Sequence, residues 1–342
     1  MTARDLELDF LTRDYGDAAG EARACRRDCA LFDFSFLSRA RVSGDGALDA
    51  LARLQPRPMG DLAPGRIRYA LRLDAAGSVV ADLTIWNLGE GVFEIMSGRR
   101  ADVIDLAALA PRQTRVDDLS DATCVYALQG PGALHAIADL TDAVRLRALS
   151  YFGHDEFRVA GHDCRIGRLG YTGEQGFELV VSRRDGAALW QCLAERARPA
   201  GFAAADCLRI EAGLILFVNE CVLAPSPAEL GLARFAPRAG RAPRMHLACF
   251  TAESAFEPVL WRPSPEGLRP PVPGTITVTS ACRGIVSDTC LGLGFVHHGD
   301  ANPGRRLRDP RGHFTRVELV SLPFYDRTKQ RPRAPWPALP ER

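Results

Sequence analysis

Residues 170–178, with the sequence GYTGEQGFE, combine residue types that can bind a flat heterocyclic ligand. Three glycines within seven residues let the backbone turn tightly and approach a ligand closely. The carboxylates of Glu174 and Glu178 can accept paired N–H donors, and Tyr171 offers an aromatic face for stacking. Taken alone, however, the pattern is more typical of a glycine-rich hairpin turn with solvated acids.

The basic and thiol side chains exclude several other chemistries. Of 342 residues, 43 are Lys or Arg, but the only lysine is Lys329, in a Pro/Arg-rich tail. A Walker-type phosphate loop and Schiff-base chemistry both need a suitably placed lysine, so the sequence argues against both. Ten cysteines are scattered without a C-x-x-C pair, which predicts small buried hydrophobes rather than a metal site or a disulfide framework.

Composition describes an ordinary globular chain. Hydrophobic residues make up 46% and charged residues 25%, and the formal net charge is +1. The balanced charge gives no footprint for nucleic acid, and no apolar run reaches the length of a membrane span. Because the N-terminal sequence does not resemble a signal peptide, we expect a cytoplasmic protein without nucleic-acid or membrane partners.

Hydrophobic patterns predict an α+β fold in two successive units, followed by a β-rich end. In the first unit, an alternating hairpin, a third strand and a helix are expected at residues 67–74, 79–88, 92–97 and 100–110. A similar pattern of strands and helices recurs from about residue 124, including helices at 185–201 and 205–215. Short strands after residue 236 favour a small β-barrel or sandwich. The expected domains are residues 1–235 and 236–326, with a flexible tail over 327–342.

Eight motifs in order resemble the glycine-cleavage T-protein family of tetrahydrofolate-dependent aminomethyltransferases, over about residues 15–326. The most specific is GYTGEQGFE; YALRLDAAGSVVADLTIW resembles the family's hairpin, and ADCLRIEAGLILF its D-x-L-R-x-E-A-G helix. The other five are LFDFSFLSRARVSG, YALQGPGA, SPAELGL, TVTSACRG and SLPFYD. The resemblance implies two ferredoxin-like α+β modules and a C-terminal β-barrel around a central folate channel.

The same resemblance implies a set of folate-binding residues. Glu174 and Glu178 are candidates for gripping the pterin ring, and Tyr69 and Tyr171 for lining the channel. Arg209 would support the site from its helix, although a salt-bridge network of Arg209 with Glu211 and Asp206 that holds this helix to the core explains it equally well.

Departures from the family pattern concern the chemistry. The family's catalytic acid is the first Asp of a D-D-L step; here that position is Ala81, and Asp82 is the remaining candidate catalytic residue. Neighbours on a strand point to opposite faces, so Asp82 replaces the missing acid only if a one-residue bulge shifts the register. Arg262 stands where it can replace a family arginine, and Phe36 replaces a histidine.

We therefore expect a divergent tetrahydrofolate-dependent transferase of aminomethyl or methyl groups. Its partners would be a small-molecule one-carbon donor and, as a second candidate, a carrier protein. The alternative is a non-catalytic folate-binding protein, or a partner subunit that has lost the catalytic carboxylate. Membership in the iron–sulfur-assembly branch is not expected, because its Lys-Gly-Cys motif is missing.

Overall fold

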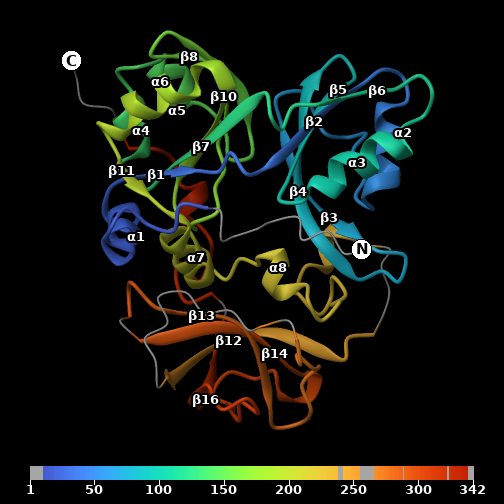
Figure 1. Ribbon diagram of the computed structural model, residues 1–342, viewed down its shortest axis with the longest axis vertical. Coiled ribbons are helices and arrows are strands. Elements are labelled where there is room, and N and C mark those ends of the chain that lie inside the picture. Colours follow the sequence, from blue (N-terminus) through green and yellow to red (C-terminus); the bar gives the residue numbers. More distant parts are fainter. Residues whose placement is uncertain are drawn as a thin grey trace.

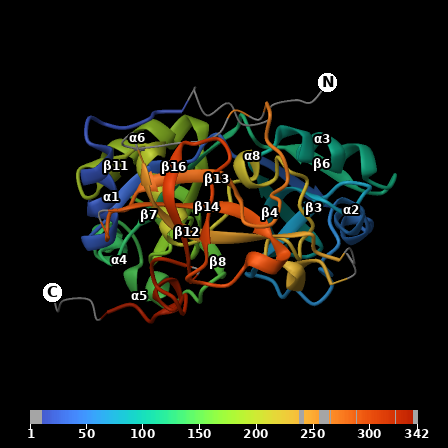
Figure 2. The ribbon, with the colours of Figure 1, turned by 90° about the horizontal axis from the view of Figure 1, so that it is seen from below.

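The computed structural model describes residues 11–237, 242–254, 264, 266–287, 289–321 and 323–337. These residues form three β-sheets with helices packed against them, so the protein is an α+β protein, as the sequence predicts. Two sheets with their helices lie side by side in Figure 1, and the third sheet lies below them. Seen from below, the third sheet crosses the junction between the other two (Figure 2).

The first sheet has the order β3-β4-β5-β2-β6. Its strands are β2 (Ser38–Ser43), β3 (Ile67–Leu73), β4 (Val79–Gly89), β5 (Val92–Ser97) and β6 (Arg115–Asp118). Helices α2 (Ala47–Leu54) and α3 (Arg100–Leu109) cover one face, where alternate residues of β4 such as Leu83 and Ile85 join a common core with Leu51 and Leu106. The predicted hairpin is confirmed, with β3 and β4 antiparallel.

The second sheet has the order β11-β1-β7-β10-β9-β8. Its strands are β1 (Ala30–Asp33), β7 (Thr123–Gln129), β8 (His154–Val159), β9 (His162–Gly167), β10 (Gly176–Ser182) and β11 (Arg198–Ala200). Helices α4 (Ala133–Ile137), α5 (Ala143–Arg147) and α6 (Arg183–Ala194) pack on one face. Helices α1 (Ala18–Arg27) and α7 (Phe202–Glu211) pack on the other, which explains why β7 and β10 are almost continuously buried.

Chain pairing differs from the predicted two successive units. Strand β1 precedes the first sheet in sequence but pairs with β7 and β11 of the second sheet, so the two units are interleaved. The helix expected over residues 185–201 was too long, because α6 ends at Ala194 and Arg198–Ala200 form β11. Pro199 lacks a backbone N–H and pairs in the parallel edge strand instead of continuing a helix.

The third sheet contains β12 (Met245–Ser254), β13 (Ile276–Arg283), β14 (Cys290–His297), β15 (Arg306–Leu307) and β16 (Phe314–Val320), in the order β13-β14-β12-β16-β15. The predicted β-barrel is corrected to an open five-stranded sheet within the described ranges. A single bridge between Thr275 and Arg308 connects the ends of its two edge strands, β13 and β15. The edge strand β15 has only two residues, too short to close a barrel with β13.

Shorter helical segments join these units. They are α8 (Phe217–Glu220) and the 3-10 helices η2 (Ala233–Phe235), η3 (His298–Asp300) and η4 (Arg331–Arg333). Residues 327–337 were expected to be part of a flexible tail. Near the end of this segment, Trp336 is only 4% exposed and packs in the core of the second unit. This packing follows from the one large aromatic residue in an otherwise Pro/Arg-rich segment.

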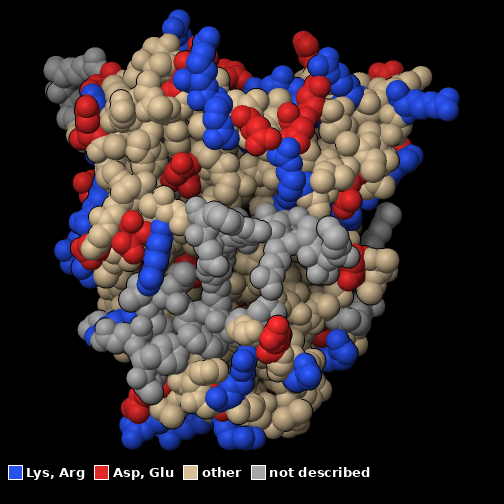
Figure 3. Space-filling model, in the orientation of Figure 1, with Lys and Arg blue, Asp and Glu red and all other residues tan. Residues whose placement is uncertain are grey.

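The distribution of charged side chains agrees with the balanced net charge of the chain. Basic and acidic side chains are interspersed on the face shown in Figure 3. All ten cysteines are free. In the part of the chain that the structure describes, no helix is long and apolar enough to cross a membrane, and no three metal-ligating side chains cluster.

Candidate functional site

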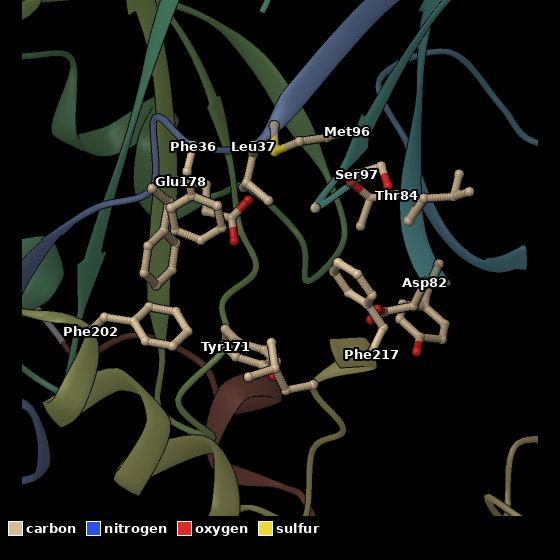
Figure 4. Close-up of a pocket in the computed structure, with 15 residues that line it drawn as sticks. Phe36, Leu37, Asp82, Thr84, Met96, Ser97, Tyr171, Glu178, Phe202 and Phe217 are labelled. Carbon is tan, nitrogen blue, oxygen red and sulfur yellow. The ribbon is translucent and has the colours of Figure 1, made fainter. Parts of the chain in front are cut away.

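A cavity of about 130 Å³ lies where the first sheet meets the second sheet, α7 and α8. An engineered cavity of about 150 Å³ holds benzene, so the space here accepts one ring of a ligand. Most of its lining is aromatic or aliphatic, and Figure 4 shows these side chains converging on the space. The apolar lining residues are Phe34, Phe36, Leu37, Leu83, Met96, Phe202, Leu216 and Phe217.

Asp82 supplies a carboxylate on the β4 side of the cavity (Figure 4). The pairing of β3 with β4 shifts register next to Ala81, because Arg72 pairs with Ala81 and Leu73 pairs with Val79. The sequence analysis made a bulge the condition for Asp82 to replace the missing acid. Because this bulge precedes Ala81, and Ala81 and Asp82 keep their regular pairing with Arg72 and Leu71, the replacement stays a prediction. Burial raises the pKa of Asp82 to about 6, although a hydrogen bond from Tyr69 favours the charged form.

Ala81 lies in a different environment from its neighbour. It is fully buried and packs with Phe202, Leu216 and Phe217, residues that also border the cavity. A carboxylate at this position would have to displace that apolar packing. The surrounding aromatic side chains therefore fit alanine, and the acid of this wall is Asp82.

Glu178 supplies the second carboxylate, from β10 on the opposite side of the cavity (Figure 4). It is 7% exposed, and no hydrogen bond or ion pair to it is found among the described residues. Burial alone raises its pKa to about 7. A buried carboxyl group without a protein partner is costly unless a ligand supplies donors, so Glu178 has the character of a ligand-binding group.

The glycine-rich loop before β10 positions Tyr171 beside Glu178. The Tyr171 hydroxyl donates a hydrogen bond to the backbone carbonyl of Ile215, which fixes the ring at the cavity. Gly173 has a φ of +79°, a conformation that favours glycine. A side chain at Gly170 would force the amide end of the buried Gln129 side chain to move.

The structure places Glu174 away from the cavity lining. Its carboxylate lies 3.1 Å from a guanidinium nitrogen of Arg26 on α1 and 3.6 Å from one of Arg331. The guanidinium of Arg26 also pairs with Glu211 at 2.9 Å. Glu174 thus anchors the back of the loop, and its assignment to pterin binding stays a prediction from resemblance.

Arg209 also lies outside the lining, buried completely in α7. It forms ion pairs with Asp206 at 2.6 Å and with Glu220 of α8 at 2.8 Å. It further donates a 3.1 Å hydrogen bond to the carbonyl of Leu214, close to the segment that holds Tyr171. Of the salt-bridge network considered for Arg209, the pair with Asp206 is present, whereas Glu211 pairs with Arg26 and Glu220 takes its place. The network also fixes a segment that borders the cavity.

Of the two remaining predicted binding residues, one lines the cavity and the other lies outside the described residues. Tyr69 lines the cavity and packs edge-on against Phe235, with ring centroids 4.9 Å apart. Arg262 lies outside the described residues, so its role stays a prediction. Phe36 lines the cavity and packs edge-on against Phe34 and Phe202.

Several polar and apolar lining residues were not identified from the sequence. Thr84 and Ser97 line the cavity from β4 and β5. Thr84 follows Asp82 by two residues, so strand alternation was a signal that could have identified it. Phe202 and Phe217 come from α7 and α8, and no local pattern shows that these two helices meet the first sheet.

Comparison with known proteins gives concordant matches. A family model described as the GCVT N-terminal domain matches residues 11–238. The chain is 35% identical to the aminomethyltransferase of Saccharopolyspora erythraea over 338 residues, covering 91% of this chain and 90% of the relative. It is 32% identical to that of Streptomyces coelicolor, covering 92% and 91%. The crystal structure of glycine cleavage system aminomethyltransferase T from Bartonella henselae matches with a TM-score of 0.79 and 25% identity, covering 93% and 92%.

Fold and site define an α+β protein with an acid- and aromatic-lined ligand cavity at the junction of two sheets. The chain belongs to the glycine-cleavage T-protein, or aminomethyltransferase, family. The resemblance predicted from the motifs is therefore confirmed over most of the chain.

Proposed function

We propose that the protein transfers an aminomethyl or methyl one-carbon unit to tetrahydrofolate. The observation that carries this proposal is the placement of two carboxyl groups, Glu178 and Asp82, on opposite walls of one aromatic cavity. Family membership and the intact GYTGEQGFE loop support it. When bound, tetrahydrofolate supplies the ring nitrogen that accepts the one-carbon unit.

The residues present fit the pterin ring of such a ligand. The unpaired carboxylate of Glu178 can accept two N–H donors from the pterin, and Tyr171 and the phenylalanines supply apolar contact. The cavity has room for one ring, and a pterin is a fused pair of rings, so part of the pterin and the whole glutamate tail would extend outside it. We further propose that the two sheets are ferredoxin-like modules that enclose the folate channel together with the third sheet.

Asp82 is the proposed acid–base and electrostatic group. Its raised pKa lies close to neutral pH, where a carboxyl group can both accept and release a proton. When the bond between the donor and an aminomethyl carbon breaks, the donor keeps the bonding electron pair and positive charge develops on the aminomethyl unit, which a nearby carboxylate stabilises. Tyr69 holds the Asp82 carboxylate by a hydrogen bond.

The donor is proposed to be an amine, carried either by a small molecule or by a carrier protein. Acidic and aromatic groups in the cavity suit a cationic amine. The Bartonella henselae protein acts in a glycine cleavage system, and this supports a carrier-bound donor. A non-catalytic folate-binding protein is not favoured, because Asp82 keeps a carboxylate in the cavity and the relatives are aminomethyltransferases.

Calorimetry with tetrahydrofolate tests the binding step. We expect a dissociation constant in the micromolar range, which corresponds to a binding free energy of about −8 kcal/mol. Glu178→Gln should weaken binding, whereas Glu174→Gln reports whether the ion-pair cluster matters for affinity. An absence of heat and of thermal shift at high ligand concentration for the native protein would contradict the proposal.

Turnover tests the chemical step separately. Native protein is incubated with tetrahydrofolate and either an aminomethylated lipoyl carrier or methylated amines, and the one-carbon folate product is measured. Product from one donor class identifies the donor. Tight folate binding without product from any donor would instead support the non-catalytic alternative.

A further inference from the structure

The last described segment of the chain, residues 323–337, connects the third sheet to the second unit. Strand β16 lies in the lower part of Figure 1, whereas Trp336, near the other end of the segment, packs in the core of the second unit. The backbone N–H of Tyr325 donates a 2.9 Å hydrogen bond to the carbonyl of Glu211, the last residue of α7. The segment therefore passes along the outside of the site rather than ending beside its own sheet.

The side chains of this segment first contact Glu174, the acid at the back of the glycine-rich loop. The Tyr325 hydroxyl forms a hydrogen bond with Glu174, and Arg331 lies 3.6 Å from the same carboxylate. Arg26 of α1 stacks on the Tyr325 ring with its guanidinium carbon 3.8 Å from the ring centre. Glu174 is thus held between α1 and the C-terminal segment.

Its second contact lies at the end of the same loop. Trp336 stacks on Phe177 with ring centroids 4.9 Å apart and planes inclined by 21°. The guanidinium of Arg168 lies 5.2 Å from the Trp336 ring. The carbonyl of Ala334 accepts a 2.7 Å hydrogen bond from the Gln175 side chain and another from Arg168.

The loop therefore has two sides with different partners. Tyr171 and Glu178 line the cavity, while Glu174, Gln175 and Phe177 hold the C-terminal segment. Phe177 and Glu178 are adjacent on β10 and point to opposite faces of the sheet, so a shift of one shifts the other. The loop and the first residues of β10 lie between ligand cavity and C-terminal segment.

We propose that residues 325–336 are a positioning element for the folate-binding wall, with Trp336 as its principal anchor. This inference rests on the proposed folate site. The segment after residue 326 lies beyond the motifs by which the sequence resembles the family. Trp336 acts on the ligand through Phe177 and Gln175, which fix the loop that presents Tyr171 and Glu178.

Two substitutions at Trp336 test the role of the anchor. Trp336→Ala should raise the dissociation constant for tetrahydrofolate about tenfold or more, as measured by calorimetry. It should also speed amide hydrogen exchange in residues 170–178. Trp336→Phe keeps a stacking ring on Phe177 and should restore both quantities to near the native values.

A matched core variant separates positioning from general loss of stability. Leu189 lies on α6 in the same hydrophobic cluster as Trp336, and Leu189→Ala should lower the melting temperature while leaving folate affinity and loop exchange close to native. Gln330→Ala, exposed on the same segment, should change neither. Native-like affinity and exchange in Trp336→Ala, or an equal loss of affinity in Leu189→Ala, would overturn the proposal. Absence of folate binding in the native protein contradicts the proposed function instead, and loop exchange then still tests the anchor.

Discussion

The buried carboxyl group of Glu178 lowers the stability of the protein at alkaline pH but serves the proposed ligand binding. Burial raises its pKa to about 7, above the ordinary value of 4.5. A raised pKa means that the folded state binds the proton more strongly, so this stabilising contribution is complete below about pH 4.5 and is lost as the pH rises through 7. Above that pH the folded protein contains a buried negative charge for which only a ligand supplies partners.

Replacing Glu178 by Gln should therefore stabilise the protein at alkaline pH while impairing folate binding. We expect the melting temperature of Glu178→Gln to exceed that of the native protein at pH 8, by about 1–2 °C for each kcal/mol of stability gained, and the difference to shrink as the pH falls towards 4.5. Folate affinity should fall about tenfold to a hundredfold through loss of a charged hydrogen-bond acceptor. Thermal scans across this pH range check the first effect and calorimetry the second; an equal stability difference at pH 5 and pH 8 would contradict the argument.

Asp82 should affect turnover more than binding. Asp82→Asn is expected to lower kcat by about 10²- to 10⁴-fold, the usual contribution of a general acid–base group, with folate affinity nearly unchanged. Because the pKa of Asp82 is about 6, native activity should decline as the pH falls below 6. Tyr69→Phe removes a hydrogen bond that favours the carboxylate, so this decline should move to higher pH. A native-like kcat in Asp82→Asn would assign the chemistry to another group.

Residue types in the glycine-rich loop revealed part of the site without any coordinates. Glu178 and Tyr171 line the cavity as the motif indicates, but Glu174 in the same motif faces the opposite side of the loop. Sequence could not distinguish the two acids, because the division depends on Arg26, which lies 148 residues away along the chain. Phe202 and Phe217 were missed for the same reason, since only tertiary packing brings α7 and α8 to the cavity.

At the scale of elements, local patterns predicted the hairpin of β3 and β4 but not the sheet to which β1 belongs. Alternation is a local signal, whereas β1 pairs with β7 more than 90 residues later, and nothing in its four residues specifies that partner. Strand β11 was read as helix because its pairing with β1 overrides the helical pattern around it. The tail was expected to be flexible from its composition, but one buried tryptophan is sufficient to dock it.

The contact between the first two sheets contains a buried ion-pair cluster. Glu94 of β5 is 1% exposed and pairs with Arg39 of β2, with Arg41 at 2.8 Å and with Arg165 of β9 at 2.8 Å. Arg165 belongs to the second sheet, so Glu94 connects the two units that form the cavity. Burial alone would raise the pKa of Glu94, but the arginines hold it below the ordinary value of 4.5.

Removing the shared carboxylate should destabilise the protein strongly. Glu94→Gln leaves Arg39 buried without its charged partner, which costs about 3–5 kcal/mol of unfolding free energy. Because the folded pKa is lowered, the native stabilisation is present above about pH 4.5 and declines as the pH falls through lower values, where the variant and native proteins should converge. Denaturant titrations at pH 7 and pH 3.5 measure this, with Glu156→Gln, an exposed partner of Arg165, as the control that changes little. A loss of unfolding free energy smaller than 1 kcal/mol at pH 7 would show that the ion-pair cluster around Glu94 is not needed for stability.

For the whole molecule, Arg209 connects α7 and α8, which border the cavity, to the third sheet. From α7 it pairs with Glu220 of α8 and donates a 2.6 Å hydrogen bond to Ser280 of β13 in the third sheet. Glu220 in turn accepts hydrogen bonds from Thr279 and from the backbone N–H of Leu216, which borders the cavity. The third sheet is therefore attached to the cavity wall through one buried polar network.

Arg209→Met should release this attachment, because it leaves Glu220 and Asp206 buried without their cation, at a cost of about 3–5 kcal/mol. The double variant Arg209→Met/Glu220→Met removes both charges of the main pair, so it should be less destabilised than the sum of the two single variants. Denaturant unfolding of the four proteins gives the coupling energy, and calorimetry shows whether folate affinity falls with it, as the contact of Glu220 with Leu216 requires. If the effects of the two single variants simply add, Arg209 and Glu220 act independently, and their ion pair does not connect the third sheet to the cavity.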